Sequence, residues 1–211
     1  MNLTIFGGTG ETGILVIKKA LEAEYRVTAF ARNPAKISFQ DKNLKIIKGE
    51  LTDINQIEKA MIGADVVISV LGPTGKTKGL NISTGIKNII SAMERNGVKR
   101  FIATATPSFK VPNDKFQFSF SLAIFMIKTL AKDAYCDIVA TGEAVSNSQL
   151  DWTLVRIPTL SRKPGTGKLN IGYTGTDNVK VFSLSREDLA DFLIKQINDK
   201  NYLKKAPVIS N

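Results

Sequence analysis

The sequence contains no histidine and only one cysteine, Cys136. Without histidine, neither a Ser-His-Asp nor a Cys-His arrangement can form, and a single cysteine makes a structural zinc site a poor fit. Carboxylates are the metal ligands that remain, and we expect no metal site. Any proton transfer must therefore use tyrosine, lysine, a carboxyl group, solvent or the substrate itself.

Long apolar runs are also missing. No stretch reaches the ~20 residues needed to span a bilayer, and the first residues lack the basic segment and apolar run of a secretory signal. Cys136 cannot form an internal disulfide, which agrees with a reducing compartment. We therefore expect a soluble, cytoplasmic protein with no membrane contact. The 211 residues, 43% of them hydrophobic, predict a single domain over 1–211.

The charge is one-sided, with 29 lysines and arginines against 19 acidic residues and a net charge of +10. A clustered excess would favour nucleic acid, but here the basic residues form separated pairs. Examples are Lys18-Lys19, Lys99-Arg100, Arg162-Lys163 and Lys204-Lys205. We favour solvated faces and attraction for an anionic cofactor over a nucleic-acid surface, and an RNA-binding accessory stays only as a third hypothesis.

A glycine-rich turn lies at the start of the chain, between an apolar run at 2–6 and an amphipathic run at 14–23. This order predicts a strand, a turn and a helix, the first unit of a dinucleotide-binding fold. We expect Gly7 to allow the sharp turn, Gly10 to let the main chain approach a diphosphate, and Gly13 to bring helix and strand close. The free N–H groups of the first helical turn would hold the diphosphate. The predicted cofactor-binding residues here are Gly7, Thr9, Gly10, Glu11, Thr12 and Gly13.

The end of the second predicted strand, 25–31, indicates which dinucleotide binds. An acidic residue there accepts from the ribose 2′-hydroxyl of NAD, whereas an arginine accommodates the 2′-phosphate of NADP. No acidic residue occurs between Arg26 and Gln40, and Arg32 takes its place. The sequence therefore predicts NADP(H) in preference to NAD(H), with Lys36 as a weaker auxiliary. The alternative is an exposed turn arginine without a ligand.

Strand and helix patterns alternate through the rest of the chain. Strands are predicted at 44–48, 64–70, 98–106 and 151–157, and helices at 54–62, 81–96, 126–146 and 189–197. Asp53 and Ser185 are predicted N-caps, and Gly97 is predicted to end a helix. The pattern predicts an α/β fold, a Rossmann-like doubly wound parallel sheet in the order 3-2-1-4-5-6 with helices on both faces and a final edge strand at 206–210. Ligands bind at the carboxyl ends of such strands, so the further predicted cofactor-binding residues are Glu50, Leu51, Leu71, Gly72, Thr104 and Pro158, with the loop 71–76 lining the cleft.

Phenylalanines crowd the segment 109–125 at Phe109, Phe116, Phe118, Phe120 and Phe125. Their spacing fits either a strand or a loop followed by the start of a helix. We favour core packing for them, and a hydrophobic lid over a flat aromatic substrate is the alternative. Segments 107–125 and 159–184 are interpreted as substrate-side insertions.

Taken together, five ordered landmarks make the chain resemble the atypical short-chain dehydrogenase/reductases, in particular the NmrA-like and biliverdin reductase B-like branch. These landmarks are 7–13, 27–34, 49–53, 151–158 and 185–190. The resemblance implies an NAD(P)-binding Rossmann fold with a small C-terminal substrate region. Some members of the family are NADH- or NADPH-dependent flavin reductases, and others sense the cofactor without demonstrated turnover.

The chain departs from the family at the proton donor. Typical short-chain dehydrogenases use a serine with a Tyr-x-x-x-Lys motif, but the corresponding helical region has only Tyr135, and position 139 is valine. Thr106 occupies the place of the serine, either to bind a substrate carbonyl or to cap a turn, and Pro158 and Thr159 match the loop beside the nicotinamide.

Two functions are therefore favoured over the RNA-binding accessory. The first is an NADPH-dependent reductase of a flat conjugated acceptor, namely a flavin such as FMN or FAD, a quinone or a tetrapyrrole, with Thr106 as the candidate catalytic residue. The alternative is a non-catalytic NADP(H) sensor that acts through protein partners. The sequence predicts no oligomeric state.

Overall fold

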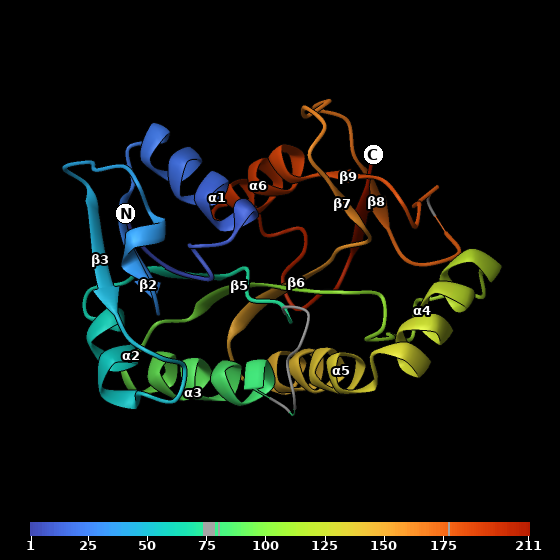
Figure 1. Cartoon of the computed structure of the whole chain (residues 1–211), viewed down its shortest axis with the longest axis horizontal. Helices are drawn as coiled ribbons and strands as arrows, with labels where there is room; N and C mark the ends of the chain where they lie inside the picture. The colour runs from blue at the N-terminus through green and yellow to red at the C-terminus, as the bar shows by residue number, and fades with distance from the viewer. Residues whose placement is uncertain (74–78, 80, 177) are drawn as a thin grey trace.

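A twisted, mostly parallel sheet organises the chain (Figure 1). The computed structural model describes residues 1–73, 79, 81–176 and 178–211, and within them the main sheet has eight strands in the order β3-β2-β1-β4-β5-β6-β10-β8. The strands are β1 (Asn2–Phe6), β2 (Arg26–Ala31), β3 (Leu44–Lys48), β4 (Val66–Ser69), β5 (Arg100–Ala105), β6 (Asp151–Arg156), β8 (Asn170–Gly172) and β10 (Val208–Ser210). The predicted order 3-2-1-4-5-6 and the Rossmann-like α/β class are confirmed.

The C-terminal strand differs from its prediction. β10 pairs in parallel with β6 and antiparallel with β8, so it lies inside the sheet and β8 takes the edge. The expectation of an edge strand at 206–210 is therefore wrong, because the short strand β8 pairs with the outer side of β10. A separate pair, β7 (Leu160–Ser161) and β9 (Leu184–Ser185), runs parallel beside it.

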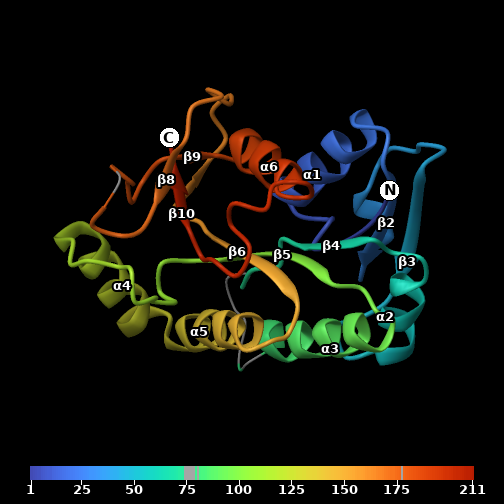
Figure 2. The same ribbon diagram turned by 180° about the vertical axis from the view of Figure 1, so that it is seen from behind.

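Helices cover both faces of the sheet (Figures 1 and 2). On one face lie α1 (Glu11–Glu22) and α6 (Arg186–Lys195), and on the other lie α2 (Ile54–Met61), α3 (Asn81–Arg95) and α5 (Lys132–Ser146), while a short 3-10 turn, η1 (Pro34–Lys36), follows β2. Successive strand side chains point to opposite faces, so Ile5 joins the core under α1 and Phe6 the core under α3. β4 is buried at all four positions, as its continuous apolar run predicts.

The predicted helix boundaries are set by local hydrogen bonds. The carboxylate of Asp53 accepts the Gln56 N–H at 3.1 Å, and the Ser185 hydroxyl accepts the Glu187 N–H at 3.1 Å. Gly97 ends α3 with a φ of +70°. Both N-caps and the terminal glycine are confirmed.

The segment around the phenylalanines forms a helix of its own, α4 (Phe118–Leu130). The helix is interrupted at Ala131, whose φ is −138° and ψ 54°. The single helix predicted over 126–146 is therefore wrong. Phe120 is 3% exposed, but Phe116, Phe118 and Phe125 are exposed. Core packing is therefore wrong for these three, because α4 projects beyond the end of the layered body, where no further element covers it in the described structure (Figures 1 and 2). No helix among the described residues has the length and apolarity to cross a membrane.

Candidate cofactor and substrate site

The glycine turn joins β1 to α1 and needs glycine for two steric reasons. Gly7 has a φ of +82°, and a Cβ there would lie 2.9 Å from the carbonyl carbon of Val70. A Cβ on Gly13 would lie 2.7 Å from the Cα of Gly8, because the helix packs directly on the turn. A Cβ on Gly10 would meet only the Gly7 carbonyl oxygen, at 3.5 Å. A side chain at position 10 would thus make only an ordinary van der Waals contact, and Gly10 itself is exposed.

The first turn of α1 provides the donors that an anion requires. The Gly10 N–H donates to the Gly7 carbonyl at 3.1 Å, and the first helical bond runs from the Ile14 N–H to the Gly10 carbonyl at 2.9 Å. The N–H groups of residues 11–13 have no acceptor within the helix, since none precedes them in the helical register. They lie at the positive end of the helix dipole, which is the arrangement that binds phosphate groups.

Glu11 connects this turn to the C-terminal part of the chain. Its carboxylate accepts hydrogen bonds from the Arg162 guanidinium and lies 3.1 Å from the Arg186 Nε. The hydrogen bond from Arg162 is the main reason that the pKa of Glu11 lies below its ordinary value. Sequence reasoning placed Glu11 beside the cofactor but missed both arginines, because they are distant in the chain and no local spacing links them to the turn.

The strands beside β1 carry the residues predicted for the adenosine end of the cofactor. Phe6 of β1 is in register with Phe30 of β2, so Arg32 lies at the same sheet edge as the glycine turn. Its side chain is exposed and has no ion-pair partner among the described residues. Lys36, on η1, is exposed as well.

The residues after β3 differ in their surroundings. Glu50 is exposed, whereas Leu51 packs against α3, where a Cβ on Gly85 would lie 2.7 Å from the Leu51 side chain. The Leu51 carbonyl accepts the Asn88 side-chain amide at 2.8 Å. Leu51 therefore fixes the loop after β3 to α3, and Glu50 stays exposed beside it.

A small pocket of about 50 Å³ opens at the carboxyl ends of β4, β5 and β6. The residues that line it are Leu71, Gly72, Pro73, Ile82, Thr104, Ala105, Thr106, Ile138, Thr141 and Ile157. The structure thus brings together the predicted Leu71, Gly72, Thr104 and Thr106, and Pro158 follows directly after a lining residue. Positions 74–76 of the predicted cleft loop lie outside the described residues.

Three threonine hydroxyls are the polar groups of this otherwise apolar pocket. The Thr104 hydroxyl donates to the Ser69 carbonyl at 3.4 Å, and the Thr106 hydroxyl oxygen accepts the Ser108 N–H at 3.2 Å. Thr141 is 4% exposed, and its hydroxyl has no hydrogen-bond partner in the described structure. A buried hydroxyl without a partner is costly, so Thr141 is available to a bound ligand.

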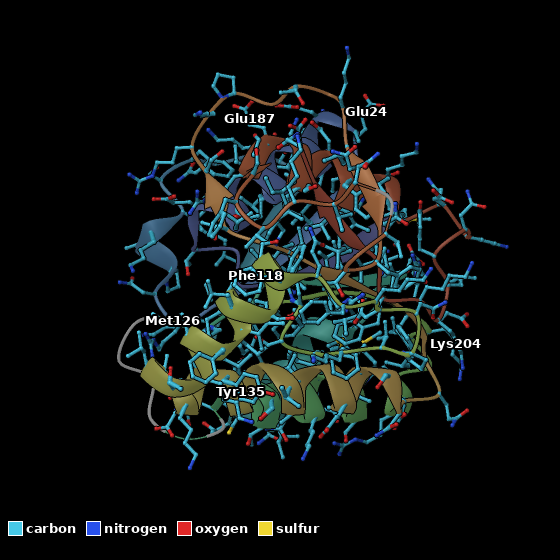
Figure 3. The ribbon with its side chains drawn as sticks, turned by 90° about the vertical axis from the view of Figure 1, so that its right-hand side faces the viewer. Glu24, Phe118, Met126, Tyr135, Glu187 and Lys204 are labelled. Carbon is cyan, nitrogen blue, oxygen red and sulfur yellow. The ribbon has the colours of Figure 1, made fainter. Side chains whose placement is uncertain are left out.

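Thr141 was missed because the family motif directs attention to positions 135 and 139 of the same helix. Tyr135 is not among the residues that line the pocket, and Lys128 of α4 places its Nζ 5.8 Å from the Tyr135 ring. Figure 3 shows Tyr135 on α5 beneath α4. No local sequence signal distinguishes Thr141 from other helical threonines.

Buried Asp137 positions the pocket wall. Its carboxylate accepts the N–H groups of Ile82 at 2.9 Å and Ser83 at 2.7 Å, at the start of α3. This places a negative charge at the positive end of that helix. Asp137 thereby joins α5 to α3 and fixes the relative positions of Ile82 and Thr141.

A second buried group, Arg156, anchors the loop after β5. Its guanidinium donates to both carboxylate oxygens of Asp114, at 2.6 and 2.9 Å, and its Nε donates to the Ala206 carbonyl at 2.7 Å. Burial raises the pKa of Asp114, but the hydrogen bonds from Arg156 and from the Val111 N–H outweigh it and hold that pKa below its ordinary value. The pair connects β6, β10 and the loop that leads to α4.

The fold and this site define a nicotinamide dinucleotide-binding protein. Residues 7–200 match the NAD(P)H-binding family, and the chain belongs to that family. The match begins at the glycine turn and covers most of the chain, in agreement with the resemblance noted from the sequence.

Individual relatives agree with this membership. The chain is 26% identical to the UPF0659 protein YMR090W of Saccharomyces cerevisiae, over 99% of this chain and 92% of that protein. It is 27% identical to the isoflavone reductase homolog P3 of Arabidopsis thaliana, over 96% of this chain but 66% of that protein. Among solved structures, the oxidoreductase ylbE of Lactococcus lactis has 25% identity and a TM-score of 0.82, over 100% of this chain and 91% of that one.

Proposed function

We propose that the protein is an NADPH-dependent reductase that transfers hydride to a flat conjugated acceptor, a flavin, quinone or tetrapyrrole. The observation that carries this proposal is the apolar pocket at the ends of β4, β5 and β6, on the same sheet edge as the glycine turn. Ligands of doubly wound sheets bind at this edge, where the strand order reverses. A cofactor laid along the edge from Arg32 would end with its nicotinamide in the pocket.

Each part of the cofactor has a proposed partner in the chain. The glycine turn, with Thr9 and Thr12, holds the diphosphate, and Arg32 holds the 2′-phosphate, which gives the preference for NADP(H). Glu50 and Leu51 border the adenine. The nicotinamide half is bordered by Leu71, Gly72, Thr104 and Pro158.

For this reaction the protein mainly has to position the acceptor against the nicotinamide ring. Bound NADPH supplies a hydride from C4 of its nicotinamide ring. The apolar walls hold the acceptor against the cofactor and exclude water. The Thr106 hydroxyl, whose oxygen already accepts the Ser108 N–H, keeps its own hydrogen for donation to an acceptor carbonyl. A conjugated acceptor takes its proton from solvent after reduction, so the missing Tyr/Lys pair is tolerated.

One observation favours the second candidate, a non-catalytic NADP(H) sensor. The described residues that line the pocket include no ionisable side chain, so proton transfer by the protein itself has no group there. A sensor would bind NADP(H) and change its protein partners without turnover.

Stopped-flow absorbance at the NADPH band separates the two candidates. With FMN, a soluble quinone or biliverdin as acceptor, the reductase oxidises NADPH faster than the enzyme-free blank. Tight NADPH binding without oxidation by any of the three acceptors would instead support the sensor. A pull-down that compares NADP⁺ with NADPH would then identify redox-dependent partners.

A further inference from the structure

An unusual apolar surface covers α4 and the segment beside it. The exposed large apolar side chains there are Phe116, Phe118, Leu122, Phe125, Met126, Leu130 and Phe182. Phe118, Phe125 and Leu130 are 71%, 60% and 77% exposed. Figure 3 shows α4 lying across the surface with Phe118 and Met126 on it. We call these seven residues the α4 patch.

The inner side of α4 is attached to the protein, so the patch faces outward. Phe120 packs with Val179, Val181 and Val208, and Ala123 adds to this cluster. Positions 118, 122, 126 and 130 are spaced four apart and share one helical face. Aromatic side chains present roughly 150–250 Å² each when uncovered, so the patch exposes several hundred Å² of apolar surface. Soluble monomers rarely expose so large a contiguous patch without a binding role.

The charges near the patch favour an anionic partner over a second copy of the chain. Four exposed lysines lie within two residues of a patch member along the chain, namely Lys115, Lys128, Lys132 and Lys180. None has an ion-pair partner among the described residues. Within residues 110–133 and 178–182, which the structure describes, the acidic residues are Asp133, which is exposed, and Asp114, which Arg156 neutralises. The whole chain carries +10, so a second copy would bring two lysine rims together, whereas an anionic surface would neutralise them.

We propose that the α4 patch docks on an anionic lipid surface, with the phenylalanines in the acyl boundary and the lysines at the headgroups. Apolar burial and attraction to anionic lipid are the two terms that bind an interfacial helix, and each lysine near such a surface contributes about 1 kcal/mol. α4 has 13 residues, a length that suits an interfacial segment. This docking is surface association and does not depend on the proposed reaction.

Vesicle co-sedimentation of the full chain tests the proposal. The wild-type protein is expected to pellet with vesicles of equal parts phosphatidylcholine and phosphatidylserine, and to stay in solution with phosphatidylcholine alone. Higher salt should weaken the binding, because it screens the lysines. Phe118→Ser with Phe125→Ser should lower the binding at least tenfold, and Lys115→Gln with Lys128→Gln should lower it for anionic vesicles.

The matched control is Ile62→Ser, which removes an apolar side chain that is 75% exposed outside the patch and should leave vesicle binding unchanged. Equal NADPH affinity in all variants shows that they fold. Absence of wild-type pelleting overturns the proposal whatever the variants do. A dimer, with a solution mass of twice 23.0 kDa, would also overturn it if the dimer fraction rises with salt and the phenylalanine variant is monomeric. The patch would then be covered by a second copy.

Discussion

Arg32 allows a direct test of the preference for NADPH over NADH, because it is exposed at the sheet edge and has no ion-pair partner among the described residues. We expect Arg32→Glu to weaken NADPH roughly tenfold to hundredfold, since a hydrogen bond to a charged group is worth about 1.5–3 kcal/mol. NADH should be affected far less, because it has no 2′-phosphate. Calorimetric titration of both dinucleotides measures the difference.

Arg26→Glu is the matched control. Arg26 is exposed at the opposite end of β2, and the substitution changes the net charge by the same amount. Equal losses of NADPH and NADH in Arg32→Glu, or no loss at all, would show that Arg32 is only a turn residue.

Thr141 tests the substrate half of the site. Thr141→Val removes a hydroxyl that has no protein partner, so the melting temperature should stay within a degree or two of the wild type. If that hydroxyl binds the acceptor, kcat/KM should fall about tenfold, the equivalent of one hydrogen bond of about 1.4 kcal/mol. Thr141→Ser should restore most of the rate. Steady-state kinetics measures this effect. An unchanged kcat/KM in Thr141→Val would exclude a hydrogen bond between the Thr141 hydroxyl and the acceptor.

At the scale of elements, the Asp114–Arg156 pair connects β6 to the loop before α4. Arg156 is fully buried, and loss of one partner from a buried pair costs about 3–5 kcal/mol. We expect Asp114→Asn to lower the free energy of unfolding by about 3 kcal/mol in urea denaturation. Glu24→Gln, at an exposed carboxylate, is the control and should change it little.

The same pair gives a pH dependence of defined sign. The pKa of Asp114 lies below its ordinary value in the folded chain, so the folded state binds this proton more weakly than the unfolded state, where the pKa is about 3.9. The stability contributed by the pair is therefore complete well above pH 3.9 and is lost as the pH falls through the folded pKa. Acid denaturation of the wild type should show this loss, and Asp114→Asn should lack it. A variant as acid-sensitive as the wild type would contradict this assignment.

The sequence predicted those elements whose signals are local. Alternation of strands and helices was sufficient for the sheet order, and single residues such as Asp53 and Ser185 marked helix starts. Core packing was the wrong prediction for Phe116, Phe118 and Phe125, because clustered phenylalanines are usually buried and nothing in the local pattern shows that tertiary structure leaves this segment outside. The Glu11–Arg162 contact and the partnerless hydroxyl of Thr141 are likewise products of packing between distant segments.

At the scale of the whole molecule, the two ends of the candidate site come from separate parts of the chain. The glycine turn follows β1 and Arg32 follows β2. Thr106 follows β5, and Thr141 lies on α5. A parallel sheet places all of these strand ends on one edge, which is why one elongated ligand can reach them all. The helix α4 lies beyond the end of the sheet (Figure 1), so docking through the α4 patch is separable from cofactor binding.

The proposed binding of the dinucleotide against the glycine turn is tested most directly at Gly10. Gly10 has φ −80° and ψ 162°, which valine adopts without strain, and a Cβ there would make only an ordinary contact with the Gly7 carbonyl oxygen at 3.5 Å. Calorimetric titration of NADPH into the wild type and Gly10→Val should show binding to the first and a loss of at least tenfold in the second, with unchanged melting temperatures in the absence of ligand. Equal NADPH affinity in the two proteins would contradict the placement of the cofactor.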